Sequence, residues 1–244
     1  MNTLTTPHPT ALTPRWLPAL LIAATLLLGG PAFAKALDQA EIVRPNDGYL
    51  GKSYGQWAAA WQQWDIGIPA LPGHPNFDDG NFDITTGQSG PVWFLAAPFG
   101  TVERTATVPK RKALFIAILN VEASNLEDFP FFGATEADQR AQAAFFADHI
   151  VNPFCVVDGK LVRRINDFRV SSPQYSFVAP DPNVLGVPAG SGTSVTDGYW
   201  VLIEPMDKGQ HTIQFGGSFH FSVANGDPFD LDAPIDMTYH LTVK

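Results

Sequence analysis

Cysteine is almost missing from this chain. A single cysteine, Cys155, occurs among 244 residues, which excludes an internal disulfide framework and any zinc site built from several thiolates. The neighbouring residues 151–157 are largely apolar. We therefore expect Cys155 to be a buried thiol that packs as a small hydrophobic group and does not act as a nucleophile.

Basic residues are also few. The chain has 15 Lys and Arg against 24 Asp and Glu, and its formal net charge is −9. This balance argues against a general nucleic-acid-binding protein, because contacts to phosphates require lysine and arginine. Hydrophobic residues nevertheless make up 45% of the chain, with 18 Phe, so the composition indicates a folded protein with a sizeable core.

Several motifs that would identify an enzyme class are missing. The sequence contains no phosphate-binding loop and no dinucleotide-binding fingerprint. Residues 87–90, Gly-Gln-Ser-Gly, lack the spacing of a nucleophile elbow, and a proline and an apolar run follow them. A serine hydrolase of that type is therefore not expected.

The one long apolar run lies near the N-terminus. Arg15 precedes an apolar stretch over residues 16–28, and the small residues Ala32 and Ala34 stand at the −3 and −1 positions of a cleavage site. These features predict a secretory signal peptide over residues 1–34 and a periplasmic or secreted protein. An uncleaved anchor is the alternative, but the run is shorter than the roughly 20 residues that span a bilayer. No later run is long enough, so we expect no membrane span after cleavage.

The remaining chain, residues 35–244, is expected to form one domain. Removing 34 residues from 244 leaves 210, and because Arg15 is the one charged residue removed, the net charge becomes −10. This length suits one core. The sequence predicts a mainly β protein, a β-sandwich or jelly-roll-like fold, with two accessory α-helices. Helices are expected over residues 53–64 and 135–149, and strands over 92–95, 101–108, 112–119, 155–157, 160–164, 199–203, 211–215, 218–223 and 236–243.

Three tryptophans form the most unusual pattern. Trp57, Trp61 and Trp64 lie at positions i, i+4 and i+7, on one face of the first helix. If exposed, such a row of indoles would suit the stacking of sugar rings, and it would bind a polysaccharide or another cell-envelope polymer. The alternative is that this face packs into the core, as aromatic stripes at helical spacing usually do.

The loop after this helix concentrates oxygen ligands. Asp78, Asp79, Asn81 and Asp83 could together bind Ca²⁺, which takes six to eight oxygen atoms from flexible loops. The spacing does not match an EF-hand, and Asp and Asn also favour turns for backbone reasons. Beyond this possible calcium site, no cofactor is expected.

Carboxylates are the other candidates for chemistry. Glu122 is the first choice, because it directly follows an apolar strand and lies near Asn120. The sequence shows no spacing that would identify a second acid as the catalytic partner of Glu122. The remaining candidates near strand ends or loops are Glu103, Glu127, Asp128 and Glu204.

Several segments, taken together, resemble a known family. They are the W-x3-W-x2-W pattern of Trp57, Trp61 and Trp64, the GQSGPVWFL segment at 87–95 and the VPxxKALF segment at 108–115. In this combination the chain resembles an uncharacterised family of exported bacterial proteins. The resemblance implies export and a common fold, and it assigns no catalytic residues. It also implies a disulfide in other members, at positions where this chain has Asp83 and Ala106.

Two classes of function follow from the sequence. The first is a non-catalytic protein that binds a polysaccharide or an envelope component through the tryptophan row. The second is a secreted hydrolase or lyase that uses carboxylates, with Glu122 foremost, in a cleft between the acidic loop and the sandwich. A purely structural role is the third alternative.

Overall fold

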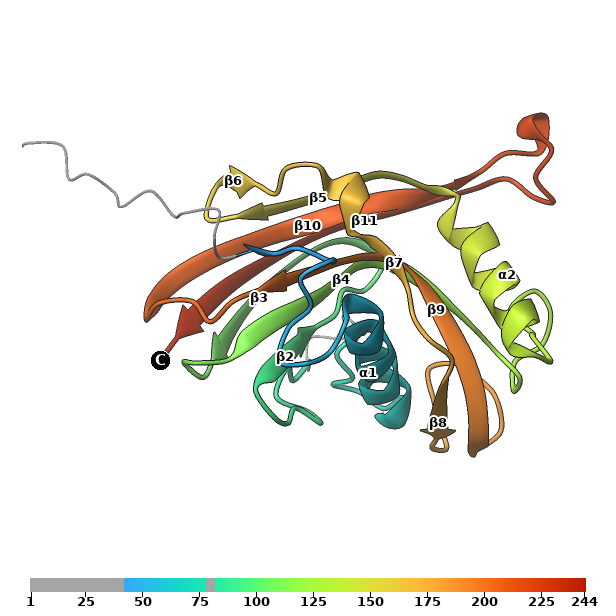
Figure 1. Ribbon diagram of the computed structural model, residues 1–244, viewed down its shortest axis with the longest axis horizontal. Coiled ribbons are helices and arrows are strands. Elements are labelled where there is room, and N and C mark those ends of the chain that lie inside the picture. The colour runs from blue at the N-terminus through green and yellow to red at the C-terminus, as the bar shows by residue number, and fades with distance from the viewer. Residues whose placement is uncertain (1–41, 78–81) are drawn as a thin grey trace, which may run out of the picture. The chain divides into compact units, whose positions relative to one another are not determined.

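A computed structural model describes residues 42–77 and 82–244 (Figure 1). The chain divides into a unit Met1–Ala36 and a unit Leu37–Lys244, and the described residues all belong to the second. The predicted signal peptide, residues 1–34, lies outside the described residues. Among the residues described, no helix is both long and apolar enough to cross a lipid bilayer.

The first sheet is built around two long strands, β4 and β9. They pair antiparallel, and β9 also pairs with three short strands, while β4 pairs in parallel with β2. The members of this sheet are β1 (Ile42–Val43), β2 (Val92–Leu95), β4 (Ala113–Ser124), β7 (Arg169–Ser171), β8 (Tyr175–Ala179) and β9 (Gly190–Ile203).

The second sheet is built around β10 and β11, which form a long antiparallel hairpin in register from Gly209↔Val243 to Phe221↔Leu231. Its strand order is β3-β11-β10-β5-β6, and β3 runs parallel to β11. The bounds are β3 (Gly100–Val108), β5 (Ile150–Val157), β6 (Lys160–Leu161), β10 (Gly209–Phe221) and β11 (Leu231–Val243).

One continuous core joins the two sheets. Leu114 and Ile116 of β4 and Trp200 of β9 belong to the same buried cluster as Phe215 and Met237 of the second sheet. The structure therefore confirms the predicted fold class, a mainly β sandwich with two accessory helices.

Both helices pack against the first sheet, on opposite sides of β9 (Figure 1). α1 (Tyr54–Gly67) contacts the face that carries Thr196, and α2 (Glu136–Ala147) contacts the face that carries Thr193. Alternate residues of a strand point to opposite faces, which makes this arrangement possible. Each helix begins with a capping box, formed by Ser53 with Gln56 and by Thr135 with Asp138.

The sequence prediction is wrong at several strands. The strand expected over residues 160–164 ends after two residues, as β6. Strands expected over residues 211–215 and 218–223 form one strand, β10, because Gly216 and Gly217 lie at an irregularity in its pairing with β5 and do not end it. The segment Tyr175–Ala179, not expected as a strand, pairs with β9 as β8.

Candidate functional site: a carboxyl-lined cavity at the edge of β4

A cavity of about 700 Å³ lies beside the second half of β4. The neighbouring strand β2 pairs only with Ala113 to Ile116 and ends at Leu95, so β2 does not cover β4 beyond Ile116. Consecutive residues of β4, from Ala117 to Glu122, line the cavity. Successive residues point to opposite faces of a sheet, so the cavity wraps around this strand edge.

The walls of the cavity are mainly apolar and come from many elements. They include α1, α2, both strands of the β10–β11 hairpin and the loops before β3, α2 and β9. The aromatic side chains in these walls are Trp61, Phe77, Phe99, Phe131, Phe146, Phe219, Phe221 and Phe229. A cavity of this size and lining is typical of sites for small organic molecules.

Two glutamates form a hydrogen-bonded pair in one wall. Glu122 on β4 and Glu127 in the following loop both line the cavity, and their carboxyl groups contact each other through a hydrogen bond. Such a bond requires a proton on one of the two carboxyls. Burial, followed by the hydrogen bond to Glu127, raises the pKa of Glu122 well above its usual range, and we therefore assign the shared proton to Glu122.

Glu127 is the acceptor of this pair. Burial raises its pKa, whereas the hydrogen bond from Glu122 lowers that pKa and partly offsets the effect. The Ser124 hydroxyl also donates to Glu127 Oε2 at 2.8 Å. The pair therefore combines a protonated acid with a carboxylate that accepts hydrogen bonds, which is the division expected of a general acid and a general base.

A short hydrogen-bond chain holds Glu122 in place. The Ser194 hydroxyl of β9 contacts Glu122 Oε2, and the Tyr175 hydroxyl of β8 donates to Ser194 Oγ at 3.0 Å. Ser194 and Tyr175 are both buried. Burial is the main cause that raises the pKa of Tyr175, which therefore stays protonated as the donor.

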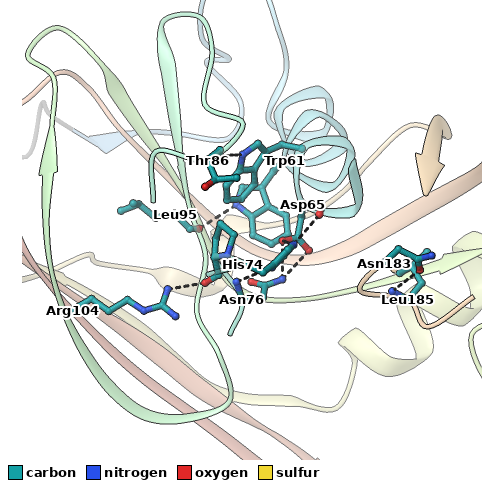
Figure 2. A network of polar contacts seen from close by, with 11 residues as sticks. Trp61, Asp65, His74, Asn76, Thr86, Leu95, Arg104, Asn183 and Leu185 are labelled. Carbon is teal, nitrogen blue, oxygen red and sulfur yellow. Dashed lines mark hydrogen bonds and ion pairs between the residues drawn. The ribbon is translucent and has the colours of Figure 1, made fainter. Parts of the chain in front are cut away.

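A third carboxyl faces the cavity from α1. Asp65 lies in the last turn of the helix, and the Asn76 side-chain amide donates to both of its carboxyl oxygens at 2.8 Å (Figure 2). Both residues line the cavity. Burial raises the pKa of Asp65 to about 7, although the hydrogen bonds from Asn76 oppose this rise.

His74 supports this arrangement as a neutral ring. The backbone amide of Asn76 donates to His74 Nδ1 at 3.1 Å, so that nitrogen carries no proton, and Nε2 lies 3.2 Å from the Asp65 carbonyl oxygen, to which it donates. Burial lowers the pKa of His74, in agreement with this tautomer. His74 thus positions the segment that carries Asn76 and adds no positive charge near Asp65.

Arg104 fixes the same segment from the second sheet. Its guanidinium donates to the carbonyl oxygens of Pro75 at 2.7 Å and Phe77 at 2.6 Å, and it lies over the ring of Phe82. Figure 2 shows Arg104 reaching this segment from the side opposite Asp65. Because the arginine is buried, these contacts satisfy a charge that would otherwise be costly.

The tryptophan row lies in the core. Trp57, Trp61 and Trp64 are buried, and their indole N–H groups donate to backbone carbonyls of Tyr49, Leu95 and Thr86. Such rings offer no open face for stacking against a polymer. Trp61 is the member of the row that also lines the cavity.

The predicted calcium ligands are only partly described. Asp78, Asp79 and Asn81 lie outside the described residues, so this site stays a prediction. The fourth, Asp83, is exposed and accepts hydrogen bonds from the backbone and hydroxyl of Thr85. Within residues 42–77 and 82–244, no group of three or more His, Cys, Asp or Glu side chains is placed to hold a metal ion.

The fold brings together two of the carboxylates considered from the sequence, Glu122 and Glu127. The other three, Glu103, Asp128 and Glu204, are exposed outside the cavity lining. Sequence reasoning missed Asp65, although an acid in the last turn of a helix is unfavourable and could have served as a signal. Cys155 is fully buried, and burial raises the pKa of its thiol to about 12, so it packs as a hydrophobic group.

Comparison with known proteins gives no match to a family model, a curated protein or a solved structure. The resemblance to a family of exported bacterial proteins therefore stays a prediction, and the function is argued from the cavity.

Proposed function

We propose that this chain is a carboxylate-dependent hydrolase that acts on a small, largely apolar substrate held in the cavity. The observation that carries the proposal is the Glu122–Glu127 pair, which shares one proton in a wall of an otherwise apolar cavity. Strongly perturbed carboxyls at a cleft are characteristic of catalytic sites.

The proposed step uses both carboxyls once. Glu127 takes a proton from a water molecule, whose oxygen forms a bond to the carbonyl carbon of an ester or amide. Glu122 gives its proton to the leaving oxygen or nitrogen as the bond to that carbon breaks. The proton gained by Glu127 then passes to Glu122 along their hydrogen bond, which restores the starting state.

Hydrolysis fits the pair better than the other functions considered from the sequence. A lyase would need a base able to remove a proton from carbon, whereas Glu127, which accepts hydrogen bonds from Glu122 and Ser124, has only to take a proton from the more acidic water molecule in hydrolysis. Binding of a polysaccharide or envelope polymer would need a surface other than the tryptophan row, because these indoles are buried. That function rests on no feature of the described residues, whereas hydrolysis rests on the pair.

Turnover by isosteric variants tests the proposal. The chain without its predicted signal peptide, residues 35–244 and called the mature chain below, is assayed on chromogenic esters and amides whose apolar groups are smaller than the cavity. Glu122→Gln and Glu127→Gln should each lower kcat by about a hundredfold or more, the usual contribution of a general acid or base. Thermal unfolding should show that both variants remain folded.

Glu204→Gln is the matched control, because Glu204 is exposed and lies outside the cavity lining. It should leave kcat and KM unchanged. Equal turnover by wild type and Glu122→Gln, or no turnover by wild type on the whole panel, would reject the hydrolase.

A further inference from the structure

Asp65 has no cationic partner among the described residues. Its carboxylate contacts the amide of Asn76, and no Lys or Arg of the described residues forms an ion pair with it. His74 Nε2 is 4.0 Å from Asp65 Oδ1, but that ring is neutral because its Nδ1 accepts a hydrogen bond. A buried carboxyl without a positively charged partner is disfavoured as the charged form, in agreement with the raised pKa of Asp65; a cation that enters beside it would favour the carboxylate.

The position of Asp65 at the C-terminal end of α1 also favours a positive charge nearby. The last turn of a helix exposes carbonyl oxygens, which give this end a partial negative charge. No basic residue occupies the last turn of α1. The helix end and the Asp65 carboxylate therefore both favour a positive charge in the adjoining space.

The other titratable groups near Asp65 supply no positive charge. Glu122 and Glu127 line the same cavity from β4 and its following loop, and Tyr175 lies behind Glu122 on β8; Glu122 and Tyr175 are protonated, and Glu127 is the negative member of its pair. Arg104, the buried cation behind the loop, uses its guanidinium on the carbonyl oxygens of Pro75 and Phe77. No Lys, Arg or His belongs to the described lining of the cavity.

Aromatic rings complete the environment of this space. Two aromatic side chains come from the same segments as Asp65 and Asn76: Trp61 from α1 and Phe77 from the loop that follows it. The other walls add Phe131, Phe146, Phe219 and Phe221. Aromatic faces attract organic cations, and they also bury apolar groups. A cavity with such walls, and with carboxyls that have no cationic partner among the described residues, is complementary to an apolar molecule that carries an ammonium group, and it disfavours anions.

We propose that Asp65 is the counter-ion for an ammonium group of the substrate, so that the hydrolase acts on small apolar esters or amides that also carry a free amino group. The proposal rests on the proposed function, because it assigns the substrate class of the same cavity. Asn76 orients the Asp65 carboxylate, and the Glu122–Glu127 pair is left free for the acid–base step. The substrate would span the distance between the two carboxyl sites.

Three matched probes test the inference by isothermal titration calorimetry on the mature chain. They are 2-naphthylmethylamine, 2-naphthylmethanol and 2-naphthoic acid, which share an aromatic body and differ in charge. Near pH 8 the amine should bind about tenfold or more tightly than the alcohol, the size expected for a desolvated charge pair, and the acid should bind most weakly. Near pH 6 amine binding should release a proton, seen as a heat that depends on the buffer, because Asp65 must ionise.

Asp65→Asn and Asp207→Asn separate the inference from a general preference for cations. Asp65→Asn should reduce the advantage of the amine over the alcohol to less than about threefold. Asp207, exposed in the turn between β9 and β10, should have no effect when replaced. An equal affinity for amine and alcohol, a preference that survives Asp65→Asn, or no binding of any probe would overturn the inference.

The two proposals fail in different ways. Binding of the amine without turnover of any ester or amide would reject the hydrolase and leave the ammonium site in place. Turnover of neutral esters at the same rate as amino esters would reject the ammonium site and support the hydrolase. A melting temperature for Asp65→Asn at or above that of the wild type shows that a lost preference does not come from unfolding.

Discussion

Asp65, Glu122 and Glu127 line a cavity whose walls are otherwise mainly apolar, and each has a raised pKa. A raised pKa means that the folded protein disfavours the ionised form, which costs stability at neutral pH. Proteins that keep such groups commonly use them at functional sites. At the scale of single residues, the cost of holding these acids in an apolar cavity is the main indication of function.

The free energy lost by burying the ionised side chain of Asp65 should appear in the pH dependence of stability. Below about pH 4 the residue is protonated in both folded and unfolded chains and has no effect. Between the unfolded pKa near 4 and the folded value of about 7, the folded state binds more protons, so the free energy of unfolding falls as pH rises. Asp65→Asn removes this loss and should stabilise the protein by a few kcal/mol near pH 8 and hardly at all near pH 4.

Urea denaturation at several pH values measures this difference. Asp207→Asn should give a curve parallel to the wild type, since Asp207 is exposed. If the stability difference between Asp65→Asn and wild type did not change between pH 4 and pH 8, the buried carboxyl would not have the pKa assigned to it.

At the scale of elements, much of the fold can be predicted from the sequence. Period-2 alternation predicts β11, where Met237, Tyr239 and Leu241 are fully buried. Local signals also predict the capping box that begins α2 and the hairpin turn that follows Val157. These features depend on neighbours in the sequence, which is why they can be found without the structure.

The site is harder to predict because its parts are distant in the chain. The sequence places Glu122 directly after an apolar strand, but the structure extends that strand to Ser124, so Glu122 lies within β4, and its pairing with Glu127 depends on the turn of the loop after β4. Asp65 reaches the same cavity only because α1 packs across the first sheet. No spacing in the sequence encodes these approaches, which arise from the packing of helix on sheet.

The close pairing of β9 with β4 beside the cavity requires a glycine. A Cβ atom added at Gly198 would lie 2.4 Å from the Leu119 carbonyl oxygen and 2.5 Å from the Asn120 Cα, so the backbones would have to separate. Gly198→Ala should therefore lower the free energy of unfolding by about 1–3 kcal/mol, the usual cost of overpacking. Chemical denaturation measures this difference in the free energy of unfolding.

Gly190→Ala, on the same strand, is the control. Its added Cβ would make only ordinary contacts, at 3.9 Å from Leu126 and Pro188, so this change should alter stability by less than about 0.5 kcal/mol. Equal effects of the two substitutions would show that the strands are not in the close register described.

At the scale of the whole molecule, the cavity follows from an unequal pairing of strands. β4 is longer than its parallel partner β2, and helices, loops and the second sheet enclose the edge that is left. The carboxyls therefore line the same cavity as the apolar side chains, so a change in the volume of this cavity tests whether it has a function.

Filling the cavity should abolish binding and turnover without removing any carboxyl. Ala233 of β11 lines the cavity and is only partly buried, so Ala233→Trp should project a large ring into it. We expect kcat/KM to fall by about a hundredfold, with little loss of stability. His240→Trp, at an exposed position on the same strand, should leave turnover unchanged, and a similar loss in both variants would contradict a role for the cavity.

The most direct test of the central claim is a pH titration of the side-chain carboxyl carbons by ¹³C NMR. Asp65→Asn, Glu122→Gln and Glu127→Gln would assign the three signals. The account predicts a midpoint near 7 for Asp65, a pKa above the usual range for Glu122 and Glu127, and a lower pKa of Glu122 in Glu127→Gln. Titration of all three carboxyls at ordinary values, unaffected by Glu127→Gln, would contradict it.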